Sequence, residues 1–147
     1  MKKLLIAIGL FATLAAPSLK AKAEDLIYRC DLPDGSSYHL SWSQNGDVFT
    51  PDFERPGKEP ITKPKVGNDL GLSEHLHTAE GVATAEIYFN TPEGLFTLGR
   101  MDRQGVISGY IEVKKPGEEE TYGECVNKTF YSNFSNPQMF ENFTVVD

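Results

Sequence analysis

Positive charge is scarce in this chain once its first 23 residues are set aside. The 147 residues include 14 lysines and arginines against 21 aspartates and glutamates, a formal charge of −7. Four of those cations and no acid precede residue 24, so residues 24–147 carry 10 cations against 21 acids, or −11. A surface of this charge repels phosphate backbones and anionic lipid head groups. We therefore expect that residues 24–147 bind neither nucleic acid nor a membrane.

The signatures of common catalytic sites are also missing. The chain has no Gly-x-Ser-x-Gly, no Walker loop, no dinucleotide fingerprint and no His-Glu-x-x-His. No segment has the apolar period of a long amphipathic helix. Because 39% of the residues are hydrophobic, the chain is too apolar to be disordered and is typical of one folded domain. These features favour a non-enzymatic binding protein without a cofactor, whose partner is a protein or, as an alternative, a small apolar ligand.

The N-terminus has the features of a bacterial secretory signal peptide. Two lysines follow Met1, and the apolar stretch 4–16 is too short to span a hydrocarbon core of about 30 Å. Small residues at Ala21 and Ala23 fit the A-x-A cleavage pattern. We expect a signal peptide at 1–23, and a single domain at 24–147 that is periplasmic or secreted.

Two cysteines, Cys30 and Cys125, lie near the two ends of that domain. In an oxidising compartment they are expected to form a disulfide, because no C-x-x-C motif suggests a redox-active thiol. Closing a loop of about 95 residues stabilises a fold by roughly 4 to 5 kcal/mol in the chain-entropy model.

Alternating apolar and polar residues, separated by Gly and Pro turns, predict an all-β fold. The first expected strand places Leu26, Tyr28 and Cys30 on one face and Ile27 on the other. Short strands joined by tight turns favour a single antiparallel meander, closed as a small barrel or folded into a sandwich. The predicted strands are 26–32, 37–43, 48–53, 82–90, 95–101, 106–113 and 120–126.

The segment 54–81 interrupts this pattern. It contains three prolines and three glycines up to Gly71 and few large apolar residues, which predicts a long loop. Loops of this length are uncommon inside compact domains. The segment is therefore either a functional flap or conceals an element near 70–76.

The C-terminal tail, 127–147, is rich in aromatic residues. Asn136-Pro137 is typical of a helix start, so we expect a short helix there. The aromatic side chains are expected to plug an open end or edge of the sheet, with an exposed partner site as the alternative. They are Phe130, Tyr131, Phe134, Phe140 and Phe143.

The three histidines provide the only candidates for metal binding or hydrolysis. His75-x-His77 lies near several acids and is a weak candidate for a divalent metal, although such histidines are usually solvated. His39 lies between two serines on the polar face of its strand, where an ordinary exposed histidine is the favoured interpretation. A small hydrolase using His39 or the His75/His77 loop is the alternative from a different functional class.

Two tyrosines are predicted to meet on the outer face of the last hairpin. If Ile107 and Ile111 point inward, Ser108 and Tyr110 point outward, and the turn at Lys115–Gly117 brings Tyr110 close to Tyr122. Exposed tyrosines ringed by acids are typical of protein-binding patches, although they also occur as ordinary cross-strand pairs. The predicted partner-binding residues are Ser108, Gly109, Tyr110 and Tyr122.

Tyr28-x-Cys30, the late Cys125 and Ser108-Gly109-Tyr110 resemble the bacterial periplasmic inhibitors of C-type lysozyme. Members of that family are small disulfide-bonded antiparallel barrels, in which a Ser-Gly motif enters the lysozyme cleft. The resemblance implies that Ser108 and Tyr110 insert into an enzyme. A charge of −11 suits a strongly basic partner of this kind.

Overall fold

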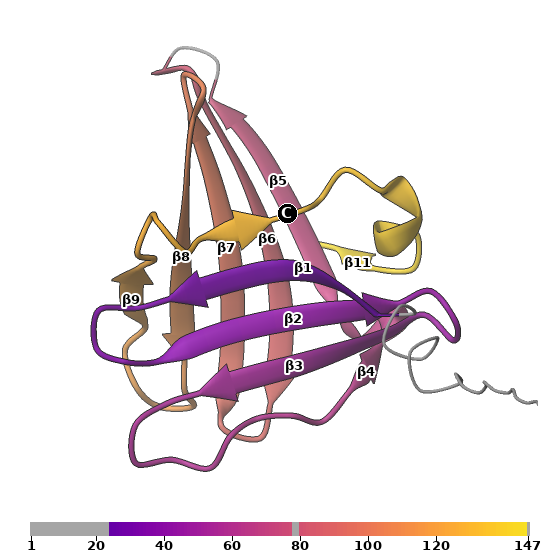
Figure 1. Cartoon of the computed structure of the whole chain (residues 1–147), viewed down its shortest axis with the longest axis vertical. Helices are drawn as coiled ribbons and strands as arrows, with labels where there is room; N and C mark the ends of the chain where they lie inside the picture. The colour runs from indigo at the N-terminus through magenta and orange to yellow at the C-terminus, as the bar shows by residue number, and fades with distance from the viewer. Residues whose placement is uncertain (1–23, 78–79, 147) are drawn as a thin grey trace, which may run out of the picture.

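The computed structural model describes residues 24–77 and 80–146, so the predicted signal peptide lies outside the described residues. The fold is all-β, as predicted, with two sheets in a sandwich-like arrangement (Figure 1). The front sheet has the order β10-β1-β2-β3-β4, with bounds Tyr131–Ser132, Glu24–Asp31, Ser37–Ser43, Val48–Glu54 and Lys65–Val66. The rear sheet has the order β11-β5-β6-β7-β8-β9, with bounds Thr144–Val145, Gly71–His77, Val82–Thr91, Gly94–Arg103, Val106–Lys114 and Thr121–Glu124.

The two sheets are not closed into a barrel, so the sandwich is the correct one of the two predicted architectures. Strands β5 to β9 pair consecutively and antiparallel, which confirms the meander. The front strands run across the rear strands, and the upper ends of β5 to β8 extend beyond the front sheet (Figure 1). Those ends have no front strand to cover them.

The segment 54–81 is not one long loop. It contains β4, a 3-10 turn at Gly67–Asp69 and β5, which pairs with β6 along its whole length. The apolar pattern of β5 is faint in the sequence because the strand begins with Gly71, whose missing side chain makes room for Tyr88. The alternative of a concealed element is therefore correct, and the loop itself spans only 55–64.

The first strand does not keep the predicted alternation. Its pairing with β2 shifts register between Leu26 and Tyr28, which indicates a β-bulge. As a result Ile27 and Tyr28 are both buried, whereas Leu26 is 40% exposed. The core that β1 helps to form is rich in aromatic residues: Tyr28, Tyr38, Trp42, Phe49, Phe53, Phe89, Phe96 and Phe143.

A covalent bond and a hydrogen-bonded tyrosine tie the sheets together at one place. The predicted disulfide joins Cys30 of β1 to Cys125, which follows β9, and is consistent with an exported protein. Two residues earlier, the Tyr28 hydroxyl donates to the carbonyl oxygens of Gly99 at 2.8 Å and Tyr110 at 3.0 Å. This side chain of the front sheet is therefore fixed to β7 and β8 of the rear sheet.

The C-terminal tail covers an edge of each sheet, as predicted. Its strand β10 pairs with β1, and β11 pairs with β5. Between them, the predicted helix is a 3-10 turn at Pro137–Phe140, which the Asn136 side chain caps by accepting from the backbone N–H of Gln138. Most of the tail aromatics pack against the core, but Tyr131 is 43% exposed. No helix in the described part of the chain is long and apolar enough to cross a membrane.

Candidate functional site

Cross-strand pairing brings four rear-sheet residues into one row on the outer face. Glu86 of β6 lies opposite Gly99 of β7, Gly99 lies opposite Tyr110 of β8, and Tyr110 lies opposite Glu124 of β9. Directly paired residues point to the same side of a sheet. The next row contains Tyr88, Thr97, Glu112 and Tyr122. We call the surface formed by Glu86, Tyr88, Tyr110, Glu112, Tyr122 and Glu124 the tyrosine face.

Gly99 determines how Tyr110 lies on this face. A Cβ atom at Gly99 would overlap the Tyr110 ring, so the absence of a side chain lets the ring lie across β7. The Tyr110 hydroxyl thereby reaches β6 and donates to Oε2 of Glu86 at 2.5 Å, while the Tyr88 hydroxyl donates to Oε1 at 2.6 Å. One carboxylate therefore holds two phenols in place.

Tyr110 and Tyr122 are close together, as predicted. Their rings stack with centroids 5.6 Å apart at an interplanar angle of 28°. The predicted exposure is wrong for Tyr110, which is 6% exposed because its ring lies over Gly99 beneath Tyr122. Tyr122 itself is 56% exposed. The tyrosine face thus exposes the Tyr122 ring, which stacks on the buried Tyr110 ring.

Ile107 lies on the same face of β8 as Ile111, as predicted, but it is not buried. Ile107 is 38% exposed, because the upper end of β8 extends past the front sheet and has no core beneath it (Figure 1). Ile111, farther down the same strand, is 2% exposed and confirms the prediction for the covered half. Only this lower half of β8 therefore contributes to the interior.

Burial and the neighbouring carboxylates keep the phenols of the tyrosine face protonated. Burial, followed by the hydrogen bond and charge of Glu86, raises the pKa of Tyr88 to about 12 and that of Tyr110 still higher. Burial also raises the pKa of Glu112. At neutral pH Tyr88 and Tyr110 are donors and flat contact surfaces, and they do not act as bases.

All four predicted partner-binding residues line one pocket. Ser108, Gly109, Tyr110 and Tyr122 surround a space of about 280 Å³ at the β8–β9 edge. Glu124 and Arg103 add one charge of each sign to its lining. Gly109 serves a packing role as well, because a Cβ there would overlap the Phe130 ring.

Neither His39 nor His75 lines this pocket. Nε2 of His39 is 3.8 Å from Oδ1 of Asp31 and forms no hydrogen bond with any described residue. His75 lies on β5, where its Nε2 is 2.8 Å from the Ser73 hydroxyl. His77 ends β5, and its side chain lies outside the described residues. No group of three or more potential metal ligands occurs within 24–77 and 80–146.

Sequence reasoning missed Glu86, Tyr88 and Gly99. A usable signal was present, because the alternation of 82–90 puts Glu86 and Tyr88 on the face opposite Ile87. Carrying the register through the two tight hairpins after β6 would have placed them beside Tyr110.

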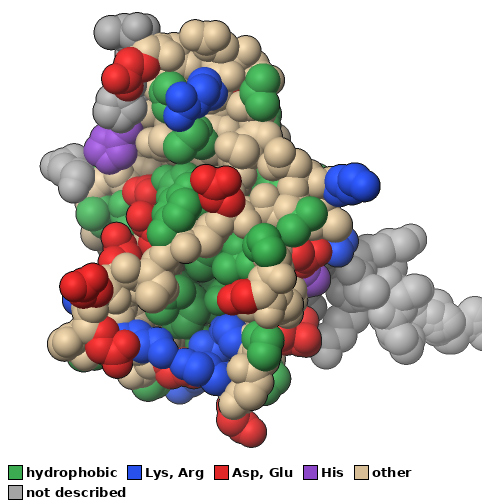
Figure 2. Space-filling model, turned by 90° about the vertical axis from the view of Figure 1, so that its left-hand side faces the viewer, with side chains coloured by type: hydrophobic (Ala, Val, Ile, Leu, Met, Phe, Trp, Pro, Cys, Tyr) green, Lys and Arg blue, Asp and Glu red, His purple; other side chains and the backbone are tan. Residues whose placement is uncertain are grey.

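Comparison with known proteins identifies no relative of this chain. No family model, curated protein or solved structure matches the chain. Figure 2 views the molecule from the side of β8 and β9 and shows hydrophobic side chains bordered by acidic ones, with lysines and arginines gathered at the lower end.

Proposed function

We propose that this is an exported, non-enzymatic protein that binds a basic protein partner through the tyrosine face. The observation that carries the proposal is the exposed Tyr122 ring stacked on the buried Tyr110 ring beside a pocket. Tyrosine offers a large contact area at low cost in side-chain entropy. Because Glu86 and Gly99 already fix Tyr110, little order remains to be imposed there on binding.

The charge of this surface supports a basic partner. Glu86, Glu112 and Glu124 surround the two stacked rings, and Arg103 is the one cation in the pocket lining. An acidic patch steers a basic protein toward it and raises the association rate. A cationic side chain of the partner would stack on Tyr122 and approach Glu124.

A C-type lysozyme is the first partner to test, because of the resemblance carried by Ser108-Gly109-Tyr110. The burial of Tyr110 changes the proposed contact, since Ser108 and Tyr122 are the more accessible side chains. The periplasm or the medium is the proposed site of action, supported by the leader sequence and the disulfide.

The test is to titrate the purified exported protein against lysozyme and against a second basic protein of similar charge, measuring both affinity and lysozyme activity. We expect Tyr122→Ala to weaken binding by about tenfold or more, as for a central aromatic contact. Tyr131→Ala is the matched control, because Tyr131 is also exposed but lies on β10 of the front sheet. Equal affinities of both variants for a bound partner would refute the tyrosine face. Absence of lysozyme inhibition at excess protein would refute lysozyme as the partner.

A further inference from the structure

Three connections contribute residues to two pockets at the lower end of the sandwich: the β1–β2 turn, the loop after β3 and the β8–β9 turn. A pocket of about 410 Å³ and an adjoining one of about 360 Å³ share part of their lining, including Tyr38 and Val113. The larger one also contacts Phe96, Lys58 and Lys115. We call the space lined by these five residues the lysine groove.

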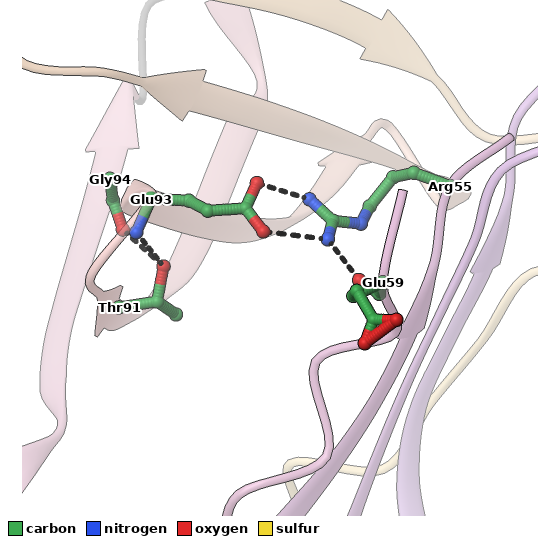
Figure 3. A network of polar contacts seen from close by, with 5 residues as sticks. All are labelled: Arg55, Glu59, Thr91, Glu93 and Gly94. Carbon is green, nitrogen blue, oxygen red and sulfur yellow. Dashed lines mark hydrogen bonds and ion pairs between the residues drawn. The ribbon is translucent and has the colours of Figure 1, made fainter. Parts of the chain in front are cut away.

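Arg55 also lines the larger pocket of the groove. Figure 3 shows its contacts with Glu93 and Glu59. Arg55 is paired in a bidentate manner with Glu93, with both N···O distances 2.9 Å, and also donates to the Glu59 carbonyl oxygen at 2.7 Å. Its side chain is 9% exposed, and its guanidinium lies 5.7 Å from the centre of the Phe96 ring. The buried Nε of Arg55 forms no hydrogen bond with any described residue.

Glu93 is already neutralised by this contact. Its backbone N–H donates to the Thr91 hydroxyl at 3.1 Å, which fixes its position in the β6–β7 turn. The hydrogen bonds from Arg55 outweigh burial and lower the pKa of Glu93. Glu93 is therefore paired with Arg55, and its charge acts on Lys58 and Lys115 without forming an ion pair with either.

Lys58 and Lys115 both line the larger pocket of the groove. The contact with the Lys115 amine, followed by charge repulsion from it, lowers the pKa of Lys58. Neither lysine forms an ion pair with a described residue. Two ammonium groups that line one pocket repel each other, and one anion placed between them would remove the repulsion.

The remaining lining limits which anion fits. Glu118, Glu119 and Asp34 also line the larger pocket. They would repel a polyvalent anion such as phosphate more strongly than a monovalent one. Tyr38, Phe96 and Val113 provide an apolar wall, and the volume lies within the usual range of small-molecule sites.

We propose that the lysine groove binds a small monocarboxylate with an aliphatic or aromatic body. The carboxylate lies between Lys58 and Lys115, and the body packs against Tyr38, Phe96 and Val113. The larger pocket of this site shares no lining residue with the tyrosine face, although the adjoining pocket also contacts Tyr122 and Glu124. The two sites also select opposite charges. Whether a monocarboxylate binds in the lysine groove therefore does not decide whether a protein binds to the tyrosine face.

The experiment compares four probes by calorimetry on the exported protein: octanoate, 1-octanol, acetate and inorganic phosphate. We expect saturable octanoate binding at least about tenfold tighter than that of the other three, because only octanoate has both a single charge and an apolar body. Octanoate that does not saturate, or that binds no better than octanol or phosphate, would overturn the proposal.

Paired lysine variants locate the site. Lys58→Gln with Lys115→Gln is expected to weaken octanoate binding by about tenfold without lowering the melting temperature, because the substitution removes a repulsion. Lys63→Gln with Lys65→Gln is the matched control, since these lysines line a neighbouring pocket. If both pairs weaken binding equally, general charge attraction explains the result and the groove assignment is wrong.

Discussion

The tyrosine face and the lysine groove differ in charge and in construction. The face lies on regular strands, and its contacts follow from the register of β6 to β9. The groove lies between connections, and a salt bridge between residues 38 positions apart supports one of its walls. The first surface is acidic and suits a macromolecule, whereas the second exposes unpaired lysines and suits a small anion.

This difference shows how little a net charge says about a particular surface. The domain carries −11, yet three of its ten cations line the larger pocket of the lysine groove. Two more, Lys63 and Lys65, line the neighbouring pocket. A partner responds to the potential within about a Debye length of its contact, roughly 8 to 10 Å at physiological salt. The overall acidity therefore excludes an anionic macromolecule better than it excludes an anionic small molecule.

Removal of the disulfide is expected to have the largest effect and to separate the two sites. Replacing Cys30 and Cys125 with serine should lower the free energy of unfolding by about 4 kcal/mol, because the long covalent loop no longer restricts the unfolded chain. Cys125 also lines the pocket of the tyrosine face but not the lysine groove. In urea titrations and binding assays, partner affinity should fall more than octanoate affinity. Equal losses at both sites would show that the two surfaces are not independent.

Gly99→Ala should damage only the tyrosine face. The new methyl group would displace the Tyr110 ring and break its contact with Glu86, at a cost of about 2 kcal/mol from overpacking. Partner affinity should fall with it, while octanoate affinity stays unchanged. Tyr110→Phe is the control, because it keeps the ring over Gly99 and removes only the hydroxyl. If Gly99→Ala binds the partner with normal affinity, the buried Tyr110 ring does not position Tyr122.

Comparison of these two sites also shows what the sequence could reveal. The seven predicted strands and the proximity of Tyr110 to Tyr122 were predictable, because alternation and tight turns define register locally. The burial of Tyr110 was not, since it depends on the missing side chain of Gly99 on another strand. The bulge at β1 was not predictable either, because one extra residue leaves no mark in a run of apolar side chains.

The lysine groove was beyond sequence reasoning for a different reason. Arg55 lay in a segment predicted to be a loop, and nothing in the sequence pairs it with Glu93 across 38 positions. The placement of Lys58 and Lys115 in one pocket likewise requires two connections from different sheets to meet at one end of the sandwich. The geometry of a site formed by loops and turns depends on tertiary packing. The geometry of the tyrosine face, which lies on strands, depends mainly on strand register.

Glu93→Gln should change the groove and spare the face. Loss of the carboxylate charge leaves the buried Arg55 without a counter-ion, and we expect a cost of about 1 to 2 kcal/mol in unfolding free energy. The uncompensated guanidinium should also raise the affinity for octanoate several-fold in calorimetry. Glu141→Gln is the control, because that exposed carboxylate lies outside the groove lining and forms no ion pair with a described residue. An unchanged affinity for octanoate would show that Arg55 does not contribute to the potential in the groove.

Alkaline titration should give the smallest effect, with opposite signs at the two sites. Because the pKa of Tyr88 is raised to about 12, the unfolded chain loses this proton first, near pH 10, and the free energy of unfolding falls as pH rises from about 10 to 12. Lys58, whose pKa is lowered by Lys115, loses its proton first in the folded state, so its contribution to stability rises as pH approaches about 10.5. Urea midpoints across this range measure both slopes.

Single substitutions assign those slopes to the two surfaces. Tyr88→Phe should make the loss of stability above pH 10 shallower, because the phenol held by Glu86 no longer titrates. Tyr131→Phe is the control, since Tyr131 forms no hydrogen bond with a carboxylate of the described residues. Lys115→Gln should reduce the gain that precedes pH 10.5, because the interaction with Lys115 is the largest cause of the lowered pKa of Lys58. If Tyr88→Phe and Tyr131→Phe change the slope equally, the alkaline loss belongs to exposed tyrosines in general and not to the network around Glu86.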